Sequence, residues 1–277
     1  MKIASIVVTY YPNVAEVVRN TMSYANECDM VIVWDNTPAT INDWSALNLL
    51  GDKLRICANG ENIGLASAYN KGIDIAMECG CSHLMTMDQD SCFENFAVLK
   101  NHVSGYAGDE YGMFCPPINN PDVPNGNICV LNDSAQSGCI FSLEMIKDVG
   151  RFRDDFFIGM VDVEMQLKAA EKGYKVVRVG GCNLIHQIGS CRLVKKLGCS
   201  FHVSDYSPLR HYYDSRNRIL MWKEFPYDYS FPLKMRHFRN RMSVCMRILL
   251  AEDNKLKKVW AIVRGSFCGL LGIAKPY

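Results

Sequence analysis

Two carboxylates stand two positions apart in the segment HLMTMDQDS (83–91), directly after a short apolar run. The apolar run suits a buried strand, whereas Asp88 and Asp90 would be costly to bury without a positive charge beside them. On an extended chain, side chains at i and i+2 point the same way, so both carboxylates could reach one hard cation such as Mg²⁺ or Mn²⁺. The alternative is a solvated loop in which Asp90 or Ser91 caps the next helix.

A second pair of acids, Asp162 and Glu164, follows two phenylalanines in FFIGMVDVEMQ (156–166). A carboxylate placed against apolar rings is a better proton acceptor than one in water, and it could take a proton from a substrate hydroxyl. Acids also complement the N-terminus of a helix, and this stretch alone favours that structural role.

Two further segments contain residues that suit metal or phosphate. His186 in LIHQIG follows an expected strand. A lone histidine is commonly structural, but a distant acid pair that still needs a ligand makes a metal role equally plausible. Arg210, Tyr213 and Arg216 lie in SPLRHYYDSRNRI (207–219). Arginine forks and aromatic rings suit phosphate-bearing partners, and the alternative is that they pack at a domain edge.

These residues must be positioned by strands and helices that alternate along the first hundred residues. Apolar strands are expected at 2–11, 29–37, 54–60 and 83–91, with helices near 12–28, 63–80 and 93–106. Such alternation predicts a parallel, doubly wound sheet, in which ligands bind beyond the carboxyl ends of the strands. The polar residues expected to line that crevice are Thr9, Tyr10, Asp35, Asn36, Asn62, Asp88 and Asp90.

Charge and cysteine usage narrow the functional classes. The formal net charge of +1 gives no reason to invoke nucleic acid. Thirteen cysteines without a framework spacing predict reduced thiols in a cytoplasmic protein, and neither a signal peptide nor a membrane span is expected. From Phe231 onward there are ten Lys or Arg and two acids. An amphipathic helix over 233–250 favours an anionic membrane surface about as much as simple packing on the domain.

Eight segments occur in the order and spacing of bacterial glycosyltransferase family 2, and most resemble its rhamnosyltransferase-like branch, which builds O-antigen and capsule polysaccharides. They are VVTYYPN (7–13), VWDNT (33–37), ENIGLASAYNKGI (61–73), MDQDS (87–91), SGCIFS (137–142), FFIGMVDVEMQLKAAEKGY (156–174), LIHQIGS (184–190) and SPLRHYYDSRNRI (207–219). The resemblance implies a GT-A fold, a Rossmann-like α/β fold with a mostly parallel central sheet flanked by helices. The GT-A domain would span 1–225, with a nucleotide-binding half (1–106) and an acceptor half (107–225), before a basic helical region at 226–277.

The resemblance also implies an activity. Such proteins use a nucleotide-diphosphate sugar with Mg²⁺ or Mn²⁺ and invert the anomeric centre. The branch suggests dTDP-L-rhamnose as sugar donor, and UDP-galactose, UDP-galactofuranose or UDP-glucose are alternatives. The acceptor would be a glycan on a polyprenyl diphosphate at the inner leaflet, so peripheral contact with the inner face of the cell membrane is expected. A binding module with a degenerate site is the non-enzymatic alternative, and the oligomeric state is left open.

The motifs also carry roles for individual residues. Asp162 matches the general base, Glu164 an acid that orients the acceptor or the active-site loop, and Asp90 with His186 the metal ligands. The expected contacts to the nucleotide sugar are Thr9, Tyr10, Asp35, Asn36, Asn62, Gly64, Asn70, Asp88, Gln89, Arg210, Tyr213 and Arg216. Two positions depart from the branch: Gly159 replaces an acid and Lys168 replaces an arginine.

Overall fold

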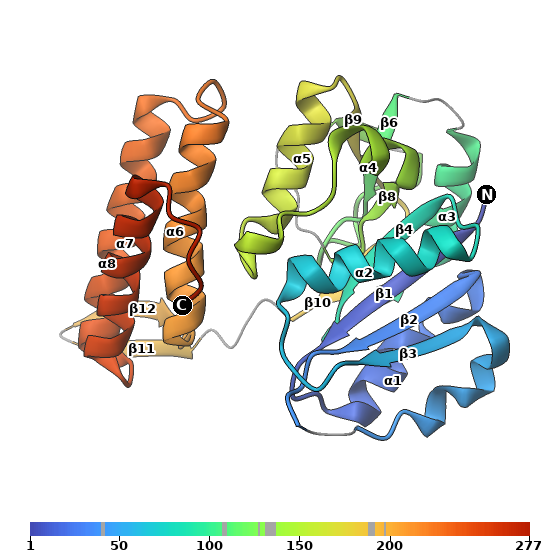
Figure 1. Cartoon of the computed structure of the whole chain (residues 1–277), viewed down its shortest axis with the longest axis horizontal. Helices are drawn as coiled ribbons and strands as arrows, with labels where there is room; N and C mark the ends of the chain where they lie inside the picture. The colour runs from blue at the N-terminus through green and yellow to red at the C-terminus, as the bar shows by residue number, and fades with distance from the viewer. Residues whose placement is uncertain (40–41, 107–109, 127, 131–136, 188–191, 197) are drawn as a thin grey trace. The chain divides into compact units, whose positions relative to one another are not determined.

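The computed structural model describes residues 1–277 except 40–41, 107–109, 127, 131–136, 188–191 and 197 (Figure 1). Contacts divide the chain into two compact units. Unit 1 comprises Met1–Asp154 and Asp162–His186, and unit 2 comprises Asp155–Val161 and Gln187–Tyr277. The expected functional boundary at residue 225 falls inside unit 2, and it stays a prediction.

Unit 1 is built on an eight-stranded sheet with the order β3-β2-β1-β4-β8-β6-β9-β7. β7 and β8 run antiparallel to their neighbours, and the other six strands are parallel, which confirms the mostly parallel sheet. The strands are β1 (Ile3–Thr9), β2 (Met30–Asp35), β3 (Leu54–Ala58), β4 (His83–Asp88), β6 (Tyr111–Cys115), β7 (Ile128–Val130), β8 (Ile140–Ser142) and β9 (Lys175–Val179).

Helices flank this sheet. The α-helices of unit 1 are α1 (Val14–Met22), α2 (Leu65–Glu78), α3 (Phe96–Gly105), α4 (Leu143–Val149) and α5 (Val161–Glu171), and its 3₁₀ helices are η1 (Ala25–Glu27) and η2 (Ser45–Lys53). A third 3₁₀ helix, η3 (Asp154–Phe156), lies at the chain boundary of the two units, and its last two residues belong to unit 2. Local sequence accounts for several helix starts. The side chain of Asn13 accepts a hydrogen bond from the Glu16 amide at α1, and that of Ser142 accepts one from the Met145 amide at α4.

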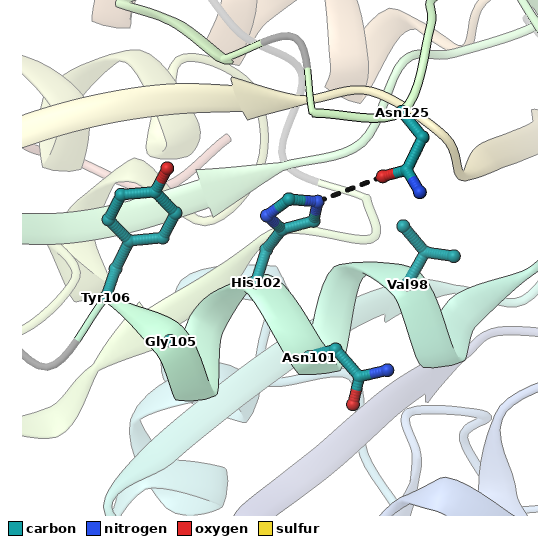
Figure 2. A pocket seen from close by; sticks show the side chains of 6 residues that line it. All are labelled: Val98, Asn101, His102, Gly105, Tyr106 and Asn125. Carbon is teal, nitrogen blue, oxygen red and sulfur yellow. Dashed lines mark hydrogen bonds between the residues drawn. The ribbon is translucent and has the colours of Figure 1, made fainter.

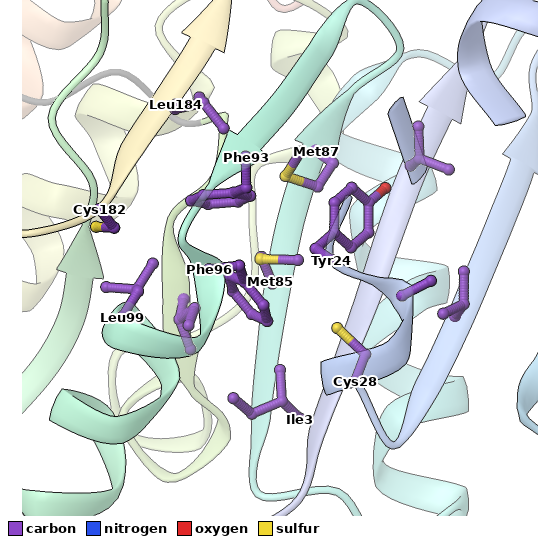
Figure 3. Packing of buried hydrophobic residues seen from close by; sticks show 14 of the residues in the cluster. Ile3, Tyr24, Cys28, Met85, Met87, Phe93, Phe96, Leu99, Cys182 and Leu184 are labelled. Carbon is purple, nitrogen blue, oxygen red and sulfur yellow. The ribbon is translucent and has the colours of Figure 1, made fainter. Parts of the chain in front are cut away.

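Both faces of the sheet are buried at β1 and β2, which explains why these strands are mainly apolar before their polar ends at Thr9 and Asp35. Ile3 and Val7 of β1 belong to a cluster that includes residues of β4, α1 and α3 (Figure 3). Strand residues alternate between faces, and Ile6 points instead toward α2, where a Cβ on Gly72 would lie 2.6 Å from Ile6 Cδ1. Continuous apolar strands are typical of a sheet covered on both sides.

One expectation about strands was wrong. The sequence predicted one extended strand over 83–91, but β4 ends at Asp88 and the chain turns at 89–90. It continues as β5 (Ser91–Glu94), which pairs with β10 (Asn183–His186) in a separate two-stranded antiparallel sheet. Asp88 and Asp90 therefore do not lie on one extended segment.

Unit 2 contains the hairpin of β11 (Arg192–Lys196) and β12 (Cys199–Val203), followed by α6 (Pro208–Glu224), α7 (Phe231–Ala251) and α8 (Lys255–Leu271). Two glycines let α8 approach the backbone of α6. A Cβ on Gly265 would collide with the carbonyl oxygen of Tyr212, and one on Gly269 would lie 2.7 Å from that of Arg216. Within the described part of the chain, no helix combines the length and the apolar character that a membrane span requires.

The close approach of α8 to α6 predicts that Gly265→Ala destabilises the protein. The added methyl group meets backbone rather than a movable side chain, and overpacking of this kind costs about 1–3 kcal/mol. Thermal and denaturant unfolding measure the change. Gly105→Ala is the matched control, because a Cβ at Gly105 meets nothing within 4 Å. Equal stability of the two variants would contradict this account of the α6–α8 contact.

Candidate functional site

Three side chains that can bind a metal come together where β4 leaves the sheet. One ligand atom from each of Asp88, Asp90 and His186 lies within 4.8 Å of the others. Asp88 ends β4, Asp90 lies in the turn that follows, and His186 ends β10 directly opposite Ser91 of β5. The structure thus brings together the two metal ligands that the resemblance implied, and it adds Asp88 to them.

The imidazole of His186 is held in place by its neighbours. Its Nδ1 lies 2.7 Å from Ser91 Oγ and 3.3 Å from Asp90 Oδ1. The side-chain amide of Asn119 makes two bonds to the backbone of His186, donating to its carbonyl at 2.8 Å and accepting from its N–H at 3.1 Å. Such contacts orient a ligand ring before a metal arrives.

A hydrogen-bonded chain connects the two sides of the cluster. The backbone N–H of Asp88 donates to Ser137 Oγ at 3.1 Å, and Ser137 Oγ donates to Ser91 Oγ at 2.8 Å. Sequence reasoning gave no role to Ser137 or Asn119 and considered Ser91 only as a helix cap. The only sequence signal for a role of Ser91 at this site is its position next to the DQD segment. The sequence does not show that β5 pairs with β10, and this pairing brings Ser91 to His186.

The ligand atoms present fit a divalent metal of the Mg²⁺ or Mn²⁺ class. Two carboxylates and one imidazole supply oxygen and nitrogen, and all three residues are half-buried. Oxygen ligands suit both ions, and imidazole is a ligand of the softer divalent metals. Two carboxylates this close to each other also repel unless a cation compensates them.

The carboxyl ends of β1, β2 and β4 lie side by side, as the crevice prediction required. The strand register pairs Thr9 with Asp35 and Val8 with Asp88. Thr9 is fully buried, and among the described residues its hydroxyl oxygen has no hydrogen-bond partner.

Asp35 and its neighbours shape the loops that follow β2 and β3. Asp35 is buried and accepts hydrogen bonds from the Thr37 amide at 3.0 Å, the Asn42 side chain at 2.6 Å and the Trp44 indole at 3.3 Å.

Asn36 and Asn62 act around the start of α2. Asn36 donates to the Gly64 carbonyl at 3.2 Å, and Asn62 accepts from the Gly64 N–H at 2.9 Å. Gly64, with φ +84°, has the left-handed backbone that favours glycine at this cap. Contacts of Asp35, Asn36, Asn62 and Gly64 with a ligand stay predictions.

Gln89 and Asn70 are likewise engaged with backbone. Gln89 accepts from the Tyr10 N–H at 2.8 Å and donates to the Tyr10 carbonyl at 3.4 Å, so it holds the turn after β1. The ring of Tyr10 itself is 49% exposed. Asn70 donates to the Phe152 carbonyl and to Asp154, both at 2.8 Å, which fastens α2 to the segment before η3.

The second acid pair lies in the first turn of α5. Asp162 is half-buried, and Glu164 is buried with a 3.1 Å ion pair to Lys168 one turn later. Lys168 also donates to the Arg151 carbonyl at 2.7 Å. The ammonium that replaces the arginine of the branch is therefore used to neutralise Glu164 and to hold the chain at Arg151.

Most of the arginine and tyrosine cluster on α6 is buried, the packing alternative that the sequence left open. Arg216 is fully buried and donates to the carbonyls of Asp155 and Lys275, the latter at 2.7 Å. Its guanidinium lies 4.8 Å from the ring centre of Tyr213, which is also buried. Arg210 remains exposed, over the ring of Tyr206. A contact of Arg216 with phosphate would require these hydrogen bonds to break.

Two other titratable residues of α6 are either uncharged or paired with opposite charge. Burial lowers the pKa of His211 to about 4, so its imidazole is neutral at pH 7. Burial alone would raise the pKa of Asp214, but the guanidinium groups of Arg241 and Arg218 outweigh it, and the pKa lies below its usual value. In this segment Arg210 is therefore the better candidate for an anion contact.

The loop that leads into Asp162 is held by Asn217, a residue that sequence reasoning missed. The side-chain amide of Asn217 donates to the carbonyls of Phe156, Ile158 and Gly159 at 2.8, 3.1 and 2.9 Å. Phe157, Gly159 and Met160 all have positive φ. Backbone of this kind persists where its surroundings impose it. Gly159 has φ +78°, so the acid that the branch carries at this position would be strained here.

A separate hollow of about 510 Å³ lies beside α3 and contains none of the predicted site residues (Figure 2). His102 and Asn125 close one side of it, with His102 Nε2 3.1 Å from Asn125 Oδ1. The hollow is therefore distinct from the cluster at the end of β4.

Comparison with known proteins adds relatives in sequence and in fold. No family profile matches the chain. The curated protein dTDP-rhamnosyl transferase RfbF from Shigella flexneri is 26% identical over 245 residues, 80% of each chain. The mannosyltransferase PcManGT from Pyrobaculum calidifontis, solved with GDP-Man and Mn²⁺, superposes with a TM-score of 0.59 at 14% identity, covering 98% of this chain and 87% of its own.

A further structural likeness is to TarS from S. aureus. The fragment TarS 1-349 superposes with a TM-score of 0.56 at 14% identity, covering 98% of this chain and 92% of the fragment. In a longer TarS structure, with a TM-score of 0.55 at 15% identity, the match covers 80% of this chain and 39% of that chain. At these identities the structural likenesses concern the fold alone.

The cluster at the end of β4 predicts Mn²⁺ binding that depends on its three ligands and on Ser91. We expect Asp90→Asn and His186→Ala to weaken Mn²⁺ binding at least about tenfold, and Ser91→Ala to weaken it by roughly 10–100-fold through loss of ring orientation. Titration calorimetry and the Mn²⁺ paramagnetic resonance signal measure this without substrate. Asp43→Asn, which changes an exposed acid elsewhere, is the control. Equal affinity of all four variants would rule out a metal at this cluster.

Proposed function

We propose that this chain, a glycosyltransferase with the GT-A fold, transfers L-rhamnose from dTDP-L-rhamnose with inversion and with a divalent metal. The acceptor would be a glycan on a polyprenyl-diphosphate carrier, in the synthesis of a surface polysaccharide. The observation that carries the proposal is the cluster of Asp88, Asp90 and His186 at the carboxyl edge of the sheet. The rhamnosyl relative supports the choice of sugar donor.

The metal site would be formed by Asp90 and His186, with Asp88 toward the ribose or diphosphate. Mg²⁺ or Mn²⁺, when bound, offsets the negative charge that builds on the departing nucleotide diphosphate. Ser91 and Asn119 keep the His186 ring and backbone in position. Asp90 and His186 would hold the cation next to the strand end where the sugar donor is expected.

The nucleotide would bind along the ends of β1 and β2. Thr9, Asp35 and Asn62 are the proposed contacts to base and ribose. The buried Thr9 hydroxyl and its register partner Asp35 support this, because both residues lie at the same carboxyl edge of the sheet as Asp88. The exposed ring of Tyr10 offers a surface for the base.

Asp162 is the proposed general base. It would accept the proton of the acceptor hydroxyl as that oxygen attacks the anomeric carbon from the face opposite the nucleotide. Glu164, held by Lys168, would orient the acceptor-side loop rather than take the proton, because its carboxylate is already buried in an ion pair. An acceptor on a lipid carrier at the inner leaflet would place the reaction on the cytoplasmic side of the membrane.

A panel of sugar donors tests the proposal. We expect dTDP-L-rhamnose with Mn²⁺ to raise the melting temperature most and to yield nucleotide diphosphate when acceptor is added, and EDTA to abolish both effects. A response only to UDP-hexoses or UDP-galactofuranose would keep the mechanism and replace the sugar donor. Full turnover in EDTA would overturn the metal-dependent mechanism.

Replacement of the proposed base separates chemistry from binding. General-base catalysis contributes on the order of 10²–10⁴-fold in rate, so Asp162→Asn should lose about that factor in turnover while its sugar-donor thermal shift persists. Asp52→Asn, at an exposed position of unit 1, is the control. Wild-type turnover in Asp162→Asn would show that another group takes the proton.

A further inference from the structure

The last helix of the chain exposes its apolar side. Five apolar residues recur on α8 at steps of three and four: Leu256, Trp260, Val263, Phe267 and Leu270. Their exposed fractions are 81%, 65%, 50%, 60% and 60%. A surface helix of a globular protein normally turns such a row toward the core. The orientation of α8 is therefore the reverse of the usual one.

The opposite side of α8 explains why this row faces outward. Ala261, Ile262, Gly265 and Gly269 are buried. A Cβ on either of the two glycines would meet a carbonyl oxygen of α6. The buried side of α8 therefore packs against α6. Turning the apolar row inward would bring large side chains to the place where only glycine fits.

The preceding helix carries a second exposed apolar row. On α7 it comprises Phe231, Met235, Phe238, Met242, Met246 and Leu249, with exposed fractions between 42% and 75%. Isolated apolar residues on a surface need no explanation, but two rows of this length on consecutive helices indicate a binding face. We call these two rows the apolar face of α7 and α8.

The charges around this face are positive. Arg236, Arg239, Lys255 and Lys257 are exposed on the same two helices. Of the two acids after Phe231, Glu252 is buried against Lys258 at 2.7 Å, which leaves Asp253 as the exposed one.

This charge pattern selects the partner. A second copy of the chain would bring like charges together across the contact, which is costly, whereas an anionic surface would be attracted. Exposed apolar rows that include aromatic residues and are accompanied by exposed Lys and Arg suit a bilayer that contains anionic lipid.

We propose that the apolar face of α7 and α8 docks on the surface of an anionic bilayer. Trp260 and Phe267 enter the boundary between headgroups and acyl chains, and the Lys and Arg side chains contact lipid phosphates. The inference does not rest on the proposed reaction, because it concerns neither the sugar donor nor the metal. It also extends to α8 a membrane contact that the sequence offered for the helix over 233–250 only as an equal alternative to packing on the domain.

Trp260 reports docking directly. Of the four tryptophans, Trp34 and Trp44 are buried and Trp222 is half-buried, whereas Trp260 is 65% exposed. With vesicles of phosphatidylcholine containing 30% phosphatidylglycerol (about that fraction supplies strong negative charge), we expect a blue shift of the full-length protein's emission and quenching by brominated acyl chains. Vesicles of phosphatidylcholine alone, or high salt, should reduce both effects.

Variants separate the apolar and the ionic contributions in vesicle flotation. The double variant Leu256→Ser with Phe267→Ser retains Trp260, and its affinity for anionic vesicles should fall by about tenfold or more. Arg239→Gln and Lys257→Gln should each weaken binding about fivefold. Leu49→Ser with Leu193→Ser, two exposed leucines outside the face, is the matched control and should bind as wild type.

Three results would overturn the proposal. One is the absence of any emission shift or flotation with anionic vesicles. Another is equal binding of the control and the Leu256→Ser, Phe267→Ser variant. The third is a wild-type protein that is a dimer in light scattering and binds no lipid, while the Leu256→Ser, Phe267→Ser variant is a monomer. That result would assign the face to contact with a second copy of the chain. Unchanged melting temperatures of the exposed-site variants would show that their weaker vesicle binding does not result from misfolding.

Discussion

The structure depends on the compensation of two neighbouring carboxylates at the end of a buried strand. Asp88 and Asp90 repel each other unless a cation compensates them. The fold prepares a place for such a cation by ending β4 at Asp88, turning the chain, and pairing β5 with β10, which sets His186 opposite Ser91. The imidazole completes a ligand set for a divalent cation. The position of the cluster at the carboxyl edge of a parallel sheet is where ligands bind in such folds.

A second constraint operates within unit 2, where α6 holds the loop that leads into α5. The Asn217 amide donates to the carbonyls of Phe156, Ile158 and Gly159 in that loop, and Arg216 donates to the carbonyl of Asp155 just before them. Arg216 also bonds the carbonyl of Lys275, so the C-terminal residues help to hold it. Polar side chains that sequence alone associates with phosphate thus serve to impose an otherwise unfavourable backbone conformation.

Much of the fold could be predicted from the sequence, and the reasons are local. The strands that became β1 to β4 are short apolar runs, and α1 to α3 follow them at helical spacing, so their order and type are written in neighbouring residues. The β5 strand could not be found this way, because SCFE is short and gains its partner from residues 183–186. The role of Arg216 could not be decided from the sequence for a similar reason, since no local pattern tells whether a guanidinium meets a ligand or a buried carbonyl.

The sequence by itself determined the α/β class, the polar strand ends and the chemical types of the candidate ligands, because periodicity and side-chain chemistry are properties of residues close together in the chain. Only the tertiary structure decided that His186 meets Asp88 and Asp90, that Asn217 supports the loop before Asp162, and that the apolar row of α8 faces outward. Each of these results from a contact between distant segments: β5 with β10, α6 with the loop 155–160, and the glycines of α8 with the backbone of α6. Close packing and strand register, which place such contacts, have no signature in any one segment.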